Sequence, residues 1–135
     1  MPILLDTGIL YAYYDRSDSW HKRAVSVIRA EAGGLIVPAP VLPEVDRLVG
    51  RRLGPKARAA LYDGFIEGDF LVADLTHDGY RRIGEMNRHF AKLDLDFVDA
   101  AIVVAAETLG ISRIATTDRR HFDPLAAALS LTLVP

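Results

Sequence analysis

The sequence predicts an α/β fold: a three-layer α/β/α sandwich around a central, mostly parallel sheet. Short apolar runs alternate with longer segments in which apolar residues recur at helical spacing. The links between these segments are short, which favours parallel strands covered by helices on both faces. The chain contains no repeat, low-complexity stretch or linker. We therefore expect a single domain that spans residues 1–135.

Five short apolar runs are expected to be strands. They are Pro2 to Leu5, Leu35 to Val37, Phe70 to Ala73, Arg113 to Thr116, and Leu131 to Val134. The first two strands enclose two expected helices. A short one covers Ile9 to Tyr14, and a longer one follows Asp18 or Ser19 and stops at Gly33-Gly34.

Further helices are expected after Pro40, from Pro55 and after Thr76. The helix after Thr76 is expected to present one apolar face, made of Tyr80, Ile83, Asn87 and Phe90. The segment from Phe97 to Leu109 is apolar nearly throughout. A helix of that composition is expected to be buried on most sides.

Composition excludes several classes of protein. The chain has no cysteine, so disulfide frameworks, thiolate zinc sites and cysteine nucleophiles are excluded. It has neither a basic, apolar leader at its start nor an apolar run near the roughly 18 residues of a membrane span. We therefore expect a cytoplasmic protein that has no membrane partner. The net charge of −2 argues at first against a nucleic-acid partner.

Two aspartates follow expected strands directly. Asp6 ends the first strand, and Asp118 comes just after the strand that contains Ile114. Ligand sites in parallel sheets form beyond the carboxyl ends of the strands, so both acids are candidates for one crevice. The alternative is that each aspartate only caps the helix that follows it.

Two further acids lie on apolar helix faces. Glu44 comes three residues after Val41 and four before Leu48, although glutamate is seldom buried without a partner. The alternative is that Glu44 reaches water at the edge of the apolar stripe. Asp99 lies in the first turn of the most apolar helix. Its alternative role is a capping arrangement with Asp96.

Together, these four acids predict a metal site. Carboxylates that converge on a partly buried crevice repel one another, unless some are protonated or a cation neutralises them. All-oxygen ligands suit Mg²⁺ or Mn²⁺ better than zinc. Magnesium also binds phosphate oxygens, so the expected reaction is metal-assisted hydrolysis of a phosphodiester without a covalent intermediate.

Four segments carry a family resemblance, and they occur in the family's order. They are Ile3–Thr7, Val41–Val45, Phe97–Glu107 and Ile114–Phe122, followed by a terminal strand that also fits. These segments resemble the PIN domain, and in particular the small VapC-type ribonuclease toxins of prokaryotic toxin–antitoxin pairs. Each motif alone is weak, but the four together cover essentially the whole chain and are quite specific.

The resemblance implies the same three-layer α/β/α fold and an acidic site for Mg²⁺ or Mn²⁺. It implies an endoribonuclease that forms a homodimer and is inhibited by a cognate VapB-type antitoxin. Carried over by position, the metal-binding and catalytic acids are Asp6, Glu44, Asp99 and Asp118. The supporting residues are Thr116, which would orient a carboxylate or a water, together with Thr7 and Asp96.

The chain departs from the family pattern at two positions. Gly8 stands where the family often has serine, which removes a supporting hydroxyl. Asp96 stands where a small residue is common, which adds negative charge beside Asp99. Neither departure removes one of the four acids, so the expected activity is retained.

Contact with RNA is expected from basic residues near the acids, and first from Arg119 and Arg120, just past Asp118. The alternative is an ordinary solvated helix face. If four of the 18 acids bind metal, 14 remain against 16 basic residues, so the rest of the chain is mildly basic. The net charge of −2 then no longer argues against RNA.

Three other functions are alternatives to this one. The segment Leu4–Gly8 resembles an aspartic-protease signature, but that fold is almost all strand. A receiver-like signalling domain needs a lysine after its last core strand, and Lys22, Lys56 and Lys92 all lie elsewhere. A catalytically inactive binding domain is the third alternative. The histidines show no zinc-ligand spacing, so we expect them at the surface or at edges.

Overall fold

A sheet of five parallel strands forms the centre of the computed structural model, which describes residues 1–135. The strands are β1 (Ile3–Leu5), β2 (Leu35–Pro38), β3 (Leu71–Ala73), β4 (Arg113–Ala115) and β5 (Thr132–Val134). Their order across the sheet is β3-β2-β1-β4-β5. The chain therefore builds outward from β1 to β3 and then returns to add β4 on the other side of β1. In parallel sheets, such a reversal opens a crevice at the carboxyl ends of the strands.

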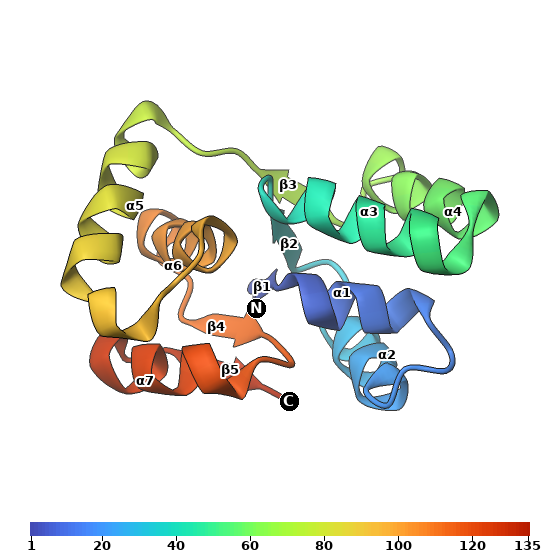
Figure 1. The fold of residues 1–135 in the computed structure, drawn as a ribbon. Coiled ribbons are helices and arrows are strands. Elements are labelled where there is room, and N and C mark those ends of the chain that lie inside the picture. Colours follow the sequence, from blue (N-terminus) through green and yellow to red (C-terminus); the bar gives the residue numbers. More distant parts are fainter.

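Helices cover both faces of this sheet. They are α1 (Thr7–Tyr14), α2 (His21–Ala30), α3 (Val41–Leu53), α4 (Pro55–Ile66), α5 (His77–His89), α6 (Phe97–Leu109) and α7 (Arg119–Leu129), with a 3₁₀ turn at Ala91–Leu93. Figure 1 shows α1 to α4 on one side of the strands and α5 to α7 on the other. This is the arrangement that right-handed crossovers produce when the direction of strand addition reverses. The predicted three-layer α/β/α architecture is confirmed.

The core lies between the sheet and its helices. All three residues of β1 are fully buried, and the segment Ala100–Ala106 of α6 is buried on every side. Helix α6 packs against both α5 and β2, which explains why its sequence is apolar around the whole helix. None of the helices combines the length and the apolarity needed to cross a membrane.

The structure differs from the sequence-based expectations in a few places. Helix α7 was given no bounds, although the capping alternative for Asp118 implied a helix there, because Pro124 lies inside it. Helix α1 begins two residues before Ile9, because Asp6 caps it. The buried face of α5 contains Ile83 and Met86, whereas Tyr80 is exposed. The predicted face of α5 was therefore rotated by about one residue.

Five helices begin at the carboxyl edge of the sheet, and four of them, all but α5, carry the predicted acids at their caps or in their first turns. Helices α1, α3 and α7 start within a few residues of the ends of β1, β2 and β4. Helix α6 leads into the start of β4, so its own first turn lies at the opposite, carboxyl edge (Figure 1). The positive ends of these four helix dipoles therefore face this edge, where they stabilise negative charge.

The burial of α6 predicts a large cost for truncating its central side chain. Ile102 is fully buried, so Ile102→Ala is expected to lower the free energy of unfolding by about 2–5 kcal/mol. Leu109, on the same helix, is 47% exposed, so Leu109→Ala serves as the matched control and should cost less than about 1 kcal/mol. Urea unfolding followed by circular dichroism measures both values. Equal losses in the two variants would contradict this packing.

Candidate functional site

Asp6 is held at the carboxyl edge by bonds from two directions. The backbone N–H of Thr7 donates to Asp6 Oδ1 at 2.7 Å, which caps α1. The hydroxyl of Thr116 donates to Asp6 Oδ2 at 2.7 Å and accepts from the backbone N–H of Asp118 at 2.9 Å. Both Asp6 and Thr116 are buried. One hydroxyl thus fixes the residues after β1 relative to those after β4.

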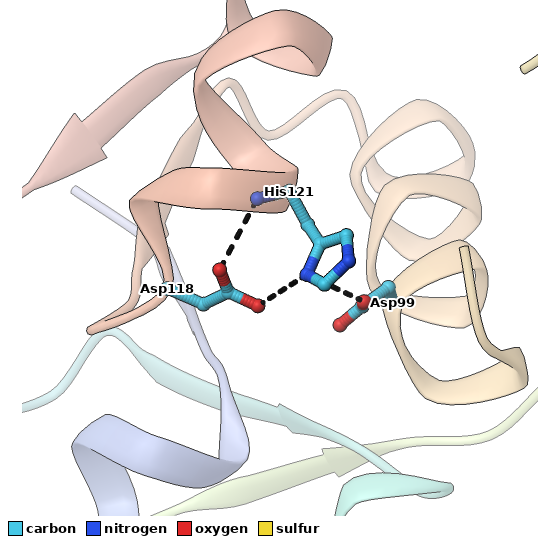
Figure 2. Close-up of side chains that lie close together, drawn as sticks. All are labelled: Asp99, Asp118 and His121. Atoms are coloured by element: carbon cyan, nitrogen blue, oxygen red, sulfur yellow. Dashed lines mark hydrogen bonds and ion pairs between the residues drawn. The ribbon is translucent and has the colours of Figure 1, made fainter. Parts of the chain in front are cut away.

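Asp118 and Asp99 approach each other across His121. Asp118 caps α7, since its Oδ1 accepts from the backbone N–H of His121 at 3.1 Å. The imidazole Nδ1 of His121 lies 2.8 Å from Asp118 Oδ2 and 4.0 Å from Asp99 Oδ2. Figure 2 shows the ring between the two carboxylates, with Asp118 and His121 on one chain segment and Asp99 on the helix that faces it.

Burial and neighbouring charge make Asp99 hard to ionise. Its side chain is nearly buried in the first turn of α6, where Asp96 accepts from the backbone N–H of Asp99 at 2.9 Å. Loss of hydration, and after it the charges of Asp96, Asp6 and Asp118, together raise the pKa of Asp99 to about 7. The charge of His121 opposes this rise but does not cancel it.

Asp6 shows the same behaviour for the same reason. Burial is the main cause that raises the pKa of Asp6 to about 6, although the bonds from Thr116 and Thr7 lower it. The charges of Asp118 and Glu44 add to the rise. Glu44 lies half-buried in the first turn of α3, so it faces this group of acids and also reaches solvent.

Some aspartates of this cluster also cap helices. Asp6, Asp96 and Asp118 each cap a helix, as the alternative interpretation expected. Asp6, Asp99 and Asp118 are nevertheless close enough that each charge acts on its neighbours. A carboxylate oxygen has two lone pairs, so one that accepts a capping bond can also bind a cation.

The donor set fits a divalent cation. Asp99, Asp118 and His121 each offer a ligand atom, and these atoms all lie within 4.8 Å of one another. Asp6 adds a further buried carboxylate next to them. Burial first, and then the neighbouring carboxylates, raise the pKa values of Asp6 and Asp99, and a bound cation would offset both effects.

His121 was expected at the surface and was not recognised as part of the site. It lies three residues after Asp118, in the first turn of α7, so the spacing that forms one helical turn brings the two side chains together. That spacing was visible in the sequence. A spacing of three residues brings two side chains together only within a helix, and no helix bounds were assigned to this segment.

The absence of a side chain at Gly8 has a steric reason in this fold. A Cβ atom on Gly8 would collide with the hydroxyl oxygen of Thr117. The space that a larger residue would fill at this position therefore already holds a hydroxyl, from the segment between Thr116 and Asp118. The hydroxyl of Thr7 is buried and makes no hydrogen bond, so the structure gives its polar atom no partner.

Five of the 16 lysines and arginines are paired with acids, namely Arg58, Arg81, Arg82, Arg113 and Arg119. Arg82 binds both Glu85 and Glu107, and Arg81 pairs with Asp78 and Glu85. The charges of these two arginines on α5 are therefore neutralised. Arg119 pairs with Asp123 and also donates to the carbonyl of Pro135. The exposed basic residues that make no ion pair are Arg16, Lys22, Arg23, Arg29, Arg47, Arg51, Arg52, Lys56, Arg88, Lys92 and Arg120.

Comparison with known proteins places this geometry in a family. A family profile described as "PIN domain" matches residues 3–127. The chain is 29% identical over 123 residues to Ribonuclease VapC26 of Mycobacterium tuberculosis, and the match covers 91% of each chain.

Two solved structures share the fold. VapC20 of Mycobacterium tuberculosis, described as a toxin that cleaves the sarcin–ricin loop, superimposes with a TM-score of 0.84 and 22% identity. That match covers 98% of this chain and 99% of VapC20. DNA-bound VapBC of Salmonella typhimurium gives a TM-score of 0.74 and 16% identity, with 98% and 96% coverage.

The raised pKa of Asp99 predicts that Asp99→Asn stabilises the metal-free protein above neutral pH. The pKa is about 7 in the folded state, against 3.8 ordinarily, so the folded chain holds more protons between these values. Wild-type stability therefore loses this contribution as pH rises from about 4 to about 7, while asparagine never ionises. The gap in Tm between variant and wild type should widen over this range in EDTA.

Thermal melts from pH 4 to pH 8 measure this gap. Glu67→Gln is the matched control, because Glu67 is an exposed acid outside the site, and its gap should not change with pH. A constant gap for Asp99→Asn would mean that the carboxyl does not ionise differently on folding.

Proposed function

The chain belongs to the PIN-domain family, and on that basis we propose that it is a metal-dependent endoribonuclease, the toxin of a VapBC-type toxin–antitoxin pair. Its substrate is RNA, and its reaction is hydrolysis of a phosphodiester bond. The name of the relative VapC26, a ribonuclease, supports the reaction. We also propose that the cofactor is Mg²⁺ or Mn²⁺.

The observation that carries this proposal is the convergence of Asp6, Asp99 and Asp118 from three separate segments. Burial and neighbouring acids destabilise the ionised forms of Asp6 and Asp99, and a structural role alone would favour fewer charges at this place. A divalent cation removes that repulsion and prefers these oxygen donors. We propose Asp6, Glu44, Asp99 and Asp118 as the residues that hold it, supported by Thr116, Thr7 and Asp96.

The chain's own residues prepare the site for this chemistry. A bound divalent cation would supply positive charge for the phosphate oxygens. It would also lower the pKa of a water molecule, so that the water can lose a proton and act as the nucleophile near neutral pH. Thr116 holds the carboxylate of Asp6 in one orientation, and Asp96 fixes the first turn of α6, which carries Asp99. Four helix N-termini stabilise the negative charge that phosphate brings to the site.

The proposal extends to partners and location. The VapBC complex of Salmonella typhimurium supports a VapB-type antitoxin as the cognate partner of this chain. A homodimer and a cytoplasmic location belong to the same proposal, as does a single domain over residues 1–135. Light scattering of the purified chain, alone and with its antitoxin, tests the assembly.

RNA cleavage is expected to require a divalent cation and the aspartates of the site. Asp6→Asn and Asp99→Asn should each reduce cleavage at least about 10²-fold, since even residues that only support metal ligands contribute 10–100-fold. Cleavage of total bacterial RNA and of intact ribosomes, resolved on gels with Mg²⁺, Mn²⁺ or excess EDTA, measures this. Glu67→Gln should cleave like the wild type.

Three outcomes separate the alternatives. Cleavage that persists in EDTA would contradict the metal mechanism. Full activity of Asp99→Asn would contradict only the assignment of that residue. If the wild type binds RNA or the antitoxin but never cleaves under any of these conditions, the chain is the inactive binding domain. Because Asp99→Asn is expected to be the more stable protein at neutral pH, its loss of activity would not reflect unfolding.

We also propose Arg119 and Arg120 as RNA contacts, since both adjoin Asp118 and Arg120 has no acid partner. Changing both to alanine should weaken RNA binding and flatten its dependence on salt. If each arginine contacts one phosphate, the slope of log K against log[salt] should fall by up to about 1.4. Binding of single-stranded RNA in EDTA, titrated at several salt concentrations, measures the slope.

Arg81 and Arg82 provide the control for this experiment. Both are already paired with acids on α5 and α6, so changing both to alanine should leave the salt slope unchanged. An equal change in the two double variants would mean that general charge, and not position beside Asp118, determines the affinity.

A further inference from the structure

His121 is a potential metal ligand that the four proposed acids do not include. Its ring lies between Asp118 and Asp99, from two different helices, and stays partly open to solvent (Figure 2). The imidazole is the only nitrogen donor in the group of close ligand atoms. Its presence changes the chemistry of the site from oxygen alone to oxygen with nitrogen.

The distances match those between ligands of one ion. Around a six-coordinate ion with bonds of about 2.1 Å, adjacent ligand atoms lie about 3.0 Å apart and opposite ones about 4.2 Å apart. The Nδ1 atom of His121 is 2.8 Å from Asp118 Oδ2 and 4.0 Å from Asp99 Oδ2. The ligand atoms of all three residues lie within 4.8 Å of one another, so one ion placed among them is within reach of all three.

The backbone already fixes the direction of the imidazole. Asp118 accepts from the His121 backbone N–H through one oxygen and contacts the ring through the other. The ring and the Asp118 carboxylate therefore already direct their ligand atoms toward each other.

We propose that His121 is a nitrogen ligand of the divalent cation, and that this ligand shifts the preference of the site from Mg²⁺ toward a first-row transition ion such as Mn²⁺. This inference rests on the proposed metal-dependent function. Mg²⁺ takes oxygen ligands and keeps several waters, whereas imidazole is a common ligand of transition ions. The acids alone would favour Mg²⁺ and Mn²⁺ similarly, so His121 is the residue that discriminates between them.

Pulsed electron paramagnetic resonance of the full chain loaded with Mn²⁺ tests ligation directly. A ring nitrogen bound to Mn²⁺ gives a ¹⁴N modulation of the electron spin echo, and wild type is expected to show it. The modulation should disappear in His121→Gln. It should persist in His89→Gln, the matched control, because His89 is an exposed histidine at the end of α5.

Metal titrations test the preference. His121→Gln is expected to weaken Mn²⁺ binding about 10-fold or more, while Mg²⁺ binding changes by less than about 3-fold. Isothermal titration calorimetry of Mn²⁺ and of Mg²⁺ against each variant gives both affinities. Equal losses for the two ions would overturn the proposed shift in preference.

The wild-type spectrum decides the inference even if a variant fails to fold. Tight Mn²⁺ binding without ¹⁴N modulation would overturn it and leave the proposed ribonuclease function intact. His121 would then only position Asp118 at the start of α7. If the wild type bound neither Mn²⁺ nor Mg²⁺, the proposed function and this inference would both be wrong.

Discussion

The hydroxyl of Thr116 is the contact on which the arrangement of the acids depends. It joins two residues 110 positions apart, since it donates to Asp6 after β1 from its own position after β4. It also accepts from the backbone N–H of Asp118, which sets the turn into α7. Thr116 is fully buried, so this bond is shielded from bulk solvent. A side chain without the hydroxyl would leave Asp6 Oδ2 buried without this donor.

The second constraint is repulsion among like charges, and the fold reduces it in several ways. Each aspartate near the site either caps a helix or lies in the first turn of one, close to backbone N–H groups. The dipoles of α1, α3, α6 and α7 point their positive ends at the same edge of the sheet. This compensation is incomplete, because Asp6 and Asp99 still hold their protons more tightly than free aspartate does.

Local patterns in the sequence were enough to predict the architecture and the positions of the aspartates. Alternating apolar runs predicted the parallel sheet, and the places of Asp6 and Asp118 after strands predicted where their backbones lie. A charged residue in the apolar helix α6 marked Asp99. These signals work because each depends on neighbours within one or two helical turns. The roles of these residues and of Glu44 stay predictions.

Features that depend on tertiary contacts could not be predicted in this way. The neutralisation of Arg82 depends on Glu107, which lies 25 residues away on another helix. The position of His121 beside Asp99 depends on how α7 packs, and α7 itself was hidden by Pro124. The contact between Gly8 and Thr117 also joins distant segments. The sequence around Gly8 indicated only that the serine hydroxyl common in the family is missing.

The place of β1 at the centre of the sheet has a consequence for protein synthesis. One partner of β1, the strand β2, follows it closely in the chain, but the other, β4, is synthesised more than a hundred residues later. Asp6 therefore meets neither Thr116 nor Asp118 until the segment after β4 has been made. A nascent chain that has not yet reached β4 therefore lacks the assembled group of acids, so the site forms as a whole and not in stages.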